Sequence, residues 1–222
     1  MKRFISVMFF VVALVIMTVP VSAYNTVTVD YGTYHYGRGG EFTLTPNGHA
    51  SESFQSFCLE TNEYFTPGHT YFYSISNGAI NGGSGGSHPD PISVGTAWLY
   101  EQFSKGTLVV SNSEQAGQLQ NTIWWLEEEK WYYNSGQYEF HDPGEGNTFR
   151  NAVITVSNYD WNYTGNSVQV LNLWEQYDST NNTYSGYAQD QLVYTSVPEP
   201  TTLLLLGFGL VGLAGLSRKL RK

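Results

Sequence analysis

The sequence predicts an α+β fold, in which a β-rich domain with sandwich or barrel strands and a helical middle segment lies between two apolar chain ends. Three observations predict it. Apolar and polar residues alternate in short segments on both sides of the chain's centre, and segments with a helical period separate them. The two ends carry unbroken apolar runs instead. A chain of 222 residues, 41% of them hydrophobic, is long enough to bury one such core.

The first 23 residues have the pattern of a secretory signal peptide. Lys2 and Arg3 give a positive start, residues 4–19 are apolar, and Pro20 ends any helix. The segment Val-Ser-Ala at residues 21–23 places small side chains before a cleavage point. We therefore expect signal peptidase to remove residues 1–23, rather than leave them as an anchor helix, and residues 24–196 to form the exported globular domain.

The exported domain begins with segments that alternate as half-buried strands do. They are residues 26–29, 42–45, 54–59 and 71–75. Residues 77–91 are rich in Gly, Ser and Asn and predict a surface loop.

Two helices follow, with clear signals at their ends. Ser93 can cap residues 94–104, and Gly106 suits the left-handed position that ends a helix. Ser111, with a glutamate three residues later, has capping-box spacing for a helix through about Lys130. Its apolar stripe consists of Leu119, Ile123 and Leu126.

The last part of the domain returns to strands. Residues 149–159 keep a helical period, although their β-branched side chains weaken this prediction. Strand-like alternation then resumes at residues 168–173 and 192–195.

Residues 197–222 combine three features in order. Pro198, Glu199 and Pro200 precede an uncharged run of sixteen residues, 201–216, and a basic tail closes the chain. Sixteen residues are fewer than the ~20 of a typical membrane helix, but prolines at the interface can mark where the helix begins. The basic tail stays cytoplasmic by the positive-inside rule, which places the domain on the other side of the membrane.

This C-terminal arrangement resembles the PEP-CTERM sorting signal, found on exported proteins of Gram-negative bacteria that make exopolysaccharide. The resemblance implies that exosortase, a membrane protease-transpeptidase, recognises Pro198, Glu199 and Pro200 and processes the protein near them. It also implies a protein that is anchored in the membrane by its C-terminal helix and then reaches the cell surface or the extracellular space. A plain C-terminal tail anchor is the alternative.

Charge and composition exclude several classes of function. Residues 24–197 contain four of the ten basic residues but 18 of the 19 acidic ones, so this surface repels nucleic acid. The single cysteine rules out a disulfide within the chain.

Three further motifs lack the context that chemistry needs. Residues 82–86 match the letters of a nucleophile elbow without the required strand and helix. The five histidines lack zinc-site spacing, and the acidic turn at residues 142–147 lacks the alternating ligands of an EF-hand. The glutamates at 127–129 are expected on a solvated helix face. We therefore expect neither an enzyme nor a metal or cofactor site.

Cys58 remains, because exported proteins seldom keep one unpaired thiol in an oxidising compartment. It lies in the motif FCLE at residues 57–60, and Gln120 lies in the motif LQNTIW at residues 119–124. These motifs resemble those of the Cys–Gln thioester domains of Gram-positive surface adhesins, although that family usually has Thr and Ala where this chain has Leu119 and Thr122. The resemblance implies that the Cys58 thiol displaces ammonia from the Gln120 amide, giving a thioester that amines can open.

These observations predict an exported, surface-sorted protein that acts as a covalent adhesin through a Cys58–Gln120 thioester. Two alternatives stay open. The many Tyr, Trp, Asn and Gln residues also suit a module that binds carbohydrate or exopolysaccharide, or a structural matrix protein. Cys58 would then be a buried residue that behaves as a small hydrophobe.

Overall fold

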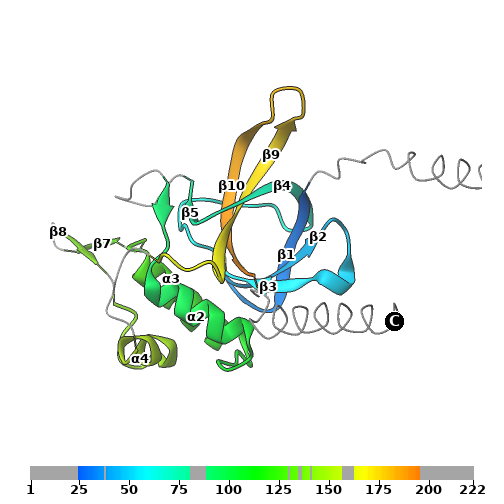
Figure 1. The fold of residues 1–222 in the computed structure, drawn as a ribbon. Coiled ribbons are helices and arrows are strands. Elements are labelled where there is room, and N and C mark those ends of the chain that lie inside the picture. The colour runs from blue at the N-terminus through cyan, green and yellow to red at the C-terminus, as the bar shows by residue number, and fades with distance from the viewer. Residues whose placement is uncertain are drawn as a thin grey trace, which may run out of the picture.

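A curled antiparallel sheet of six strands dominates the structure, a computed structural model that describes residues 25–37, 39–80, 89–129, 131–134, 137–140, 142–156 and 163–195 (Figure 1). The strand order is β10-β9-β4-β1-β2-β3. The strands are β1 (Thr26–Tyr36), β2 (Gly39–Pro46), β3 (Phe54–Ser56), β4 (His69–Ser76), β9 (Val168–Asp178) and β10 (Thr183–Tyr194). Burial alternates over residues 26–29 and 42–45, as the sequence predicts, but β1 and β2 extend beyond these segments and do not alternate throughout.

The sheet curls until its two edges meet. Directly after β3, the backbone N–H of Leu59 donates to the carbonyl of Asp190 on β10, at 3.1 Å. The N–H of Leu192 donates to the carbonyl of Phe57 at the same distance, and Cys58 forms an antiparallel bridge with Gln191 between them. This seam, formed by residues 57–59 and 190–192, closes the curl as in a barrel, which is one of the two arrangements that the sequence predicts.

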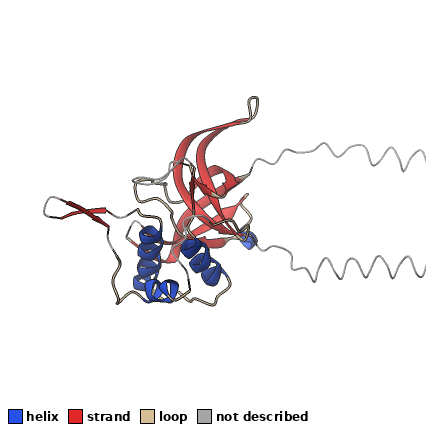
Figure 2. Ribbon diagram, turned by 60° about the vertical axis from the view of Figure 1, so that its left-hand side comes forward, coloured by secondary structure: helices blue, strands red, loops and turns tan. Residues whose placement is uncertain are grey.

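Helices gather at one end of the curled sheet (Figure 2). They are α2 (Val94–Ser104), α3 (Ser113–Leu126) and α4 (Thr148–Ile154). Helix α3 packs against β1 and β2, and α2 packs against β9 and β10. The described residues also include a short 3₁₀ turn and two small sheets, η1 (Ala50–Glu52), β5 (Gly78–Ala79) with β6 (Asp90–Pro91), and β7 (Trp131–Asn134) with β8 (Gln137–Phe140).

Buried apolar side chains form two groups, one inside the curl and one between the sheet and the helices. Cys58 belongs to the inner group, together with Val29, Phe42 and Tyr71. Its neighbours Phe57 and Leu59 belong to the outer group, which includes the apolar stripe of α3. This alternation places the thiol inside the curl while the adjoining residues face the helices.

The predicted ends of α2 agree with the structure, whereas those of α3 do not. Helix α2 begins and ends as predicted, with Ser93 accepting a hydrogen bond from the N–H of Thr96. The predicted cap of α3 was wrong, because Asn112 rather than Ser111 accepts from the N–H of Gln115, at 2.9 Å. Helix α3 also ends at Leu126, before the predicted end near Lys130, because Glu128 adopts a positive φ of 54°. Both competing residue types cap helices well, so sequence alone could not choose between them.

Other segments also depart from the prediction. Helix α4 stops at Ile154, short of the predicted residue 159, and the last two strands extend into a long hairpin that projects from the sheet (Figure 1). The predicted loop at 77–91 carries the short strands β5 and β6 at its ends, and its middle lies outside the described residues.

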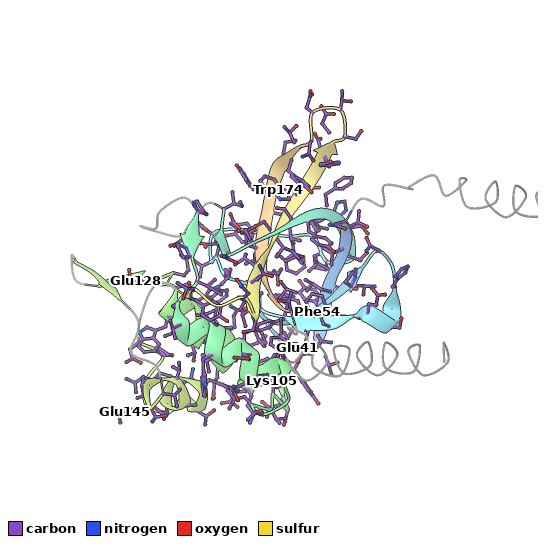
Figure 3. The ribbon with its side chains drawn as sticks, in the orientation of Figure 1. Glu41, Phe54, Lys105, Glu128, Glu145 and Trp174 are labelled. Atoms are coloured by element: carbon purple, nitrogen blue, oxygen red, sulfur yellow. The ribbon has the colours of Figure 1, made fainter. Side chains whose placement is uncertain are left out.

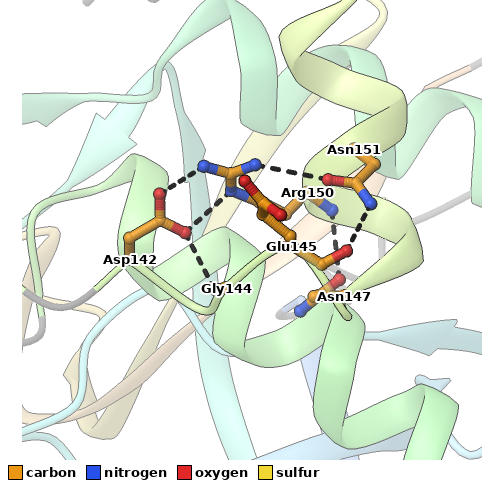
Figure 4. A network of polar contacts seen from close by, with 6 residues as sticks. All are labelled: Asp142, Gly144, Glu145, Asn147, Arg150 and Asn151. Atoms are coloured by element: carbon orange, nitrogen blue, oxygen red, sulfur yellow. Dashed lines mark hydrogen bonds and ion pairs between the residues drawn. The ribbon is translucent and has the colours of Figure 1, made fainter.

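The acidic turn before α4 is held by an arginine (Figure 4). The Arg150 guanidinium donates from Nε to the Asp142 carboxylate at 2.7 Å, and the N–H of Gly144 donates to the same oxygen at 2.8 Å. Asn147 caps the helix by accepting from the N–H groups of Phe149 and Arg150. The Asp142 carboxylate therefore serves to fix the start of α4.

No helix in the described parts of the chain is long and apolar enough to span a membrane. The predicted signal peptide at residues 1–23 and the predicted membrane helix at residues 201–216 lie outside those parts.

Candidate functional site

Cys58 lies in the seam where the sheet closes, and its side chain is 0% exposed. The thiol faces the interior, and its sulfur accepts a hydrogen bond from Nε2 of Gln191, at 3.5 Å. Burial raises the pKa of the thiol far above its ordinary value, and the hydrogen bond from Gln191 opposes that rise. The group is therefore a neutral thiol at physiological pH, shielded from solvent oxidants.

Gln120 is brought to Cys58 by α3, which crosses β1 and β2 at close range. A Cβ on Gly39, at the start of β2, would lie 2.6 Å from the ring of Trp124 and 2.9 Å from Cγ of Gln120. Only glycine leaves room for these two side chains at that position. The close approach of α3 to β2 thus depends on a residue that carries no side chain.

The Gln120 amide is hydrogen-bonded to both main-chain polar groups of Cys58. Its Oε1 accepts from the Cys58 N–H at 3.0 Å, and its Nε2 donates to the Cys58 carbonyl at 2.8 Å. The N–H of Gly40 also donates to Oε1, at 3.4 Å. Gln120 is 1% exposed. The structure therefore brings the two residues singled out from the sequence together in a buried place, with the side chain of Gln120 bonded to the main chain of Cys58.

The contacts at Oε1 have a chemical consequence. Two backbone N–H groups, those of Cys58 and Gly40, point at the oxygen of the side-chain amide. Paired backbone donors of this kind stabilise the negative charge that develops on a carbonyl oxygen during attack by a nucleophile. The two donors therefore polarise the carbonyl group of the Gln120 side-chain amide.

A cluster of buried carboxyl groups links the Cys58 segment to the end of α3. Glu60 is 3% exposed and Glu129 is 4% exposed. Glu129 accepts a hydrogen bond from the N–H of Thr61 at 3.1 Å. The prediction that residues 127–129 form a solvated helix face was wrong, since the chain turns inward after α3 and two of the three glutamates are held by polar partners. Glu127 accepts from both the N–H and the hydroxyl of Ser93.

These carboxyl groups have raised pKa values. Burial, together with repulsion from Glu129, Glu63 and Asp190, raises the pKa of Glu60 to about 10. Burial also raises the pKa of Glu127 and of Asp190, each to about 7, and it raises that of Glu129. Glu60 is therefore protonated at neutral pH in the folded protein.

We expect Glu60→Gln to stabilise the protein above neutral pH. The folded protein keeps a proton on Glu60 that the unfolded chain releases near pH 4.5, so wild-type stability falls as pH rises from there towards 10. Glutamine mimics the protonated side chain without this proton release. The variant should be more stable by roughly 5 kcal/mol at pH 8, about 1.4 kcal/mol for each pH unit above 4.5, with the difference vanishing near pH 4, as measured by urea unfolding. Glu114→Gln, on the exposed start of α3, is the control; an equal gain there would contradict the assignment.

Sequence reasoning did not single out three consecutive buried polar residues in and beside the seam. Gln189, Asp190 and Gln191 are 4%, 2% and 0% exposed. The register between β9 and β10 shifts between Ala188 and Gln191, which adds one residue to β10 at this point. The available signal was a run of three polar residues between Ala188 and Leu192, in a segment that otherwise reads as a buried strand.

A second candidate site is a surface hollow of about 320 Å³ between β3, α2 and the end of β10. It is lined by Phe54, Gln55, Tyr100, Phe103, Ser104 and Tyr194. The Lys105 ammonium lies 5.8 Å from the centre of the Tyr194 ring, and Figure 3 marks Phe54 and Lys105. Aromatic walls with a few polar groups are typical of small-ligand sites.

Comparison with known protein families matches residues 196–219 to the PEP-CTERM protein-sorting motif. This confirms the predicted sorting signal and marks an exosortase-sorted surface or extracellular protein of bacteria. Pro198, Glu199 and Pro200 fall within the match but outside the described residues. No curated protein and no solved structure matches the chain.

Proposed function

We propose that this exosortase-sorted protein is a covalent adhesin, whose exported domain forms a thioester between Cys58 and Gln120 and captures amines with it. The observation that carries the proposal is the docking of the Gln120 amide against the main chain of Cys58, through hydrogen bonds of 3.0 and 2.8 Å in a fully buried place. The resemblance of both motifs to Cys–Gln thioester domains supports it independently.

The chemistry balances within these two residues. The Cys58 sulfur attacks Cδ of Gln120, a C–S bond forms, the C–N bond to Nε2 breaks, and the thiol proton leaves with that nitrogen as ammonia. The N–H groups of Cys58 and Gly40 stabilise the oxyanion of the intermediate. A primary amine later attacks the thioester. Its nitrogen bonds to Cδ of Gln120, the C–S bond breaks, and one amine proton returns to the Cys58 sulfur, so that the amine is held as an amide and the thiol is free.

Burial gives the product a useful lifetime. Cys58 and Gln120 are 0% and 1% exposed, so bulk water is kept from a bond that it would hydrolyse. The thioester also removes the free thiol from an oxidising environment. An electrophile that is stored in this way reacts when an amine gains access to it.

The intact mass of the exported protein tests the proposal. Purified without amine buffers, it should weigh about 17 Da less than its sequence, because one ammonia is lost when the bond forms. Proteolysis should then yield the Cys58 and Gln120 peptides joined together. Full sequence mass in freshly purified protein would contradict the covalent mechanism.

The second candidate function is non-covalent binding of carbohydrate, and the hollow beside β3 and α2 favours it. Four of its six lining residues are aromatic, and three of them, Phe54, Phe103 and Tyr194, are partly exposed and can offer rings on which sugars stack. Gln55 and Ser104 add polar groups to its wall. The mass measurement separates the two functions, because sugar binding removes no ammonia.

A further inference from the structure

The bulge in β10 places two buried glutamines against the Cys58 segment, and their Nε2 groups donate to different acceptors. Gln189 donates from Nε2 to the main-chain carbonyl of Glu60, at 2.7 Å. Gln191 donates from Nε2 to the sulfur of Cys58, at 3.5 Å. Bulges commonly redirect side chains beside functional sites. Here the extra residue brings an amide to the reacting sulfur.

The other end of the Gln191 amide has no partner among the described residues. Its Oε1 is buried without a hydrogen bond there, and the residue as a whole is 0% exposed. Buried acceptors in folded proteins are nearly always satisfied, so an unsatisfied one beside a reactive group points to a transient partner. Because Oε1 and Nε2 belong to one amide, this acceptor also lies beside the sulfur.

We infer that Gln191 is a catalytic residue of the thioester site that selects primary amines. Its N–H stabilises the charge on sulfur when the C–S bond forms or breaks, and its Oε1 accepts an N–H of the nitrogen that leaves or enters. This inference rests on the proposed thioester. It assigns to the site a hydrogen-bond donor and an acceptor from a strand that neither sequence motif includes.

The preference for primary amines follows from the proton balance. When an amine opens the thioester, the C–N bond forms, the C–S bond breaks, and one N–H proton passes to the sulfur. A primary amine has a second N–H, which can stay hydrogen-bonded to Oε1 of Gln191 throughout the reaction. A secondary amine has only one N–H. It cannot both give that proton to the sulfur and keep a hydrogen bond to Gln191. Ammonia, methylamine and lysine side chains therefore fit, and dimethylamine does not.

The test compares Gln191→Met with Gln189→Met in the full exported protein. Both changes replace a buried amide of the same bulge by an apolar side chain of similar length, but Nε2 of Gln191 donates to the sulfur whereas Nε2 of Gln189 donates to the carbonyl of Glu60. The rates at which methylamine and dimethylamine open the thioester are measured by intact mass. We expect Gln191→Met to slow opening by methylamine about tenfold or more and to reduce the preference over dimethylamine. Gln189→Met should keep the wild-type preference.

The outcomes separate this inference from the proposed function. If wild-type protein shows the mass deficit but Gln191→Met keeps the wild-type rate and preference, or both variants slow equally, Gln191 only packs and the inference is overturned. If wild-type protein lacks the deficit, the proposed function fails and the inference fails with it. Should Gln191→Met not fold, as judged by circular dichroism, Gln191→Asn replaces it, since a side chain shorter by one methylene draws back from the sulfur. It should lose the preference for methylamine in the same way.

Discussion

Methylamine is expected to add to Gln120 of the wild-type protein and to leave Cys58→Ala and Gln120→Ala unmodified. The reaction needs both partners of the thioester, because sulfur activates the acyl group and Gln120 supplies it. Either substitution should therefore abolish labelling, rather than reduce it. Peptide mass spectrometry after incubation with methylamine locates the adduct, and alkylation of the released Cys58 thiol gives a second measurement.

Matched controls decide whether this loss is specific. Gln118→Ala removes another glutamine of α3, whose side chain accepts from Thr148 and does not contact Cys58, so it should label like the wild type. Cys58→Ala should cost ~1–3 kcal/mol of stability and still fold, because it removes one sulfur from a packed site. Labelling that persists in a folded Gln120→Ala protein would show that another residue carries the acyl group.

Replacing Pro198, Glu199 and Pro200 by alanines is expected to block processing while export continues. The substitution removes the part of the matched sorting motif that exosortase is expected to recognise. The predicted apolar membrane segment and the basic tail stay unchanged, so insertion into the membrane should persist. In a host that has the sorting enzyme, the variant should accumulate as unprocessed, membrane-associated protein.

Immunoblotting of membrane and medium fractions measures this effect. Thr202→Ala, two residues after Pro200, is the control and should be processed like the wild type. Normal processing of the triple-alanine protein would mean that the tail acts only as an anchor. This experiment is independent of the thioester, because the motif and the domain are separate parts of the chain.

Local signals let the sequence determine several features by itself. The limits of α2 follow from Ser93 at its start and the left-handed Gly106 after its end, which has a φ of 72°. The presence of strands at residues 26–29 and 42–45 follows from period-two alternation, although β1 and β2 are longer than these segments. The sorting signal predicted at residues 197–222, which the family match covers over residues 196–219, follows in the same way, since its three parts are contiguous. Each of these signals acts over a few neighbouring residues and needs no knowledge of the rest of the fold.

The composition of the site was decided only by the tertiary structure. The Cys58–Gln120 pair was suggested by a resemblance between motifs, but the hydrogen bonds between them join residues 62 positions apart through the packing of α3 on the sheet. Gln191 lies 133 positions from Cys58 and meets it because the sheet curls until its edges pair. Glu129 is buried because the chain turns inward beyond α3, although a glutamate side chain by itself favours solvent. Contacts of this range depend on how strands and helices pack together, and residue patterns within one strand or one helical turn carry no record of that packing.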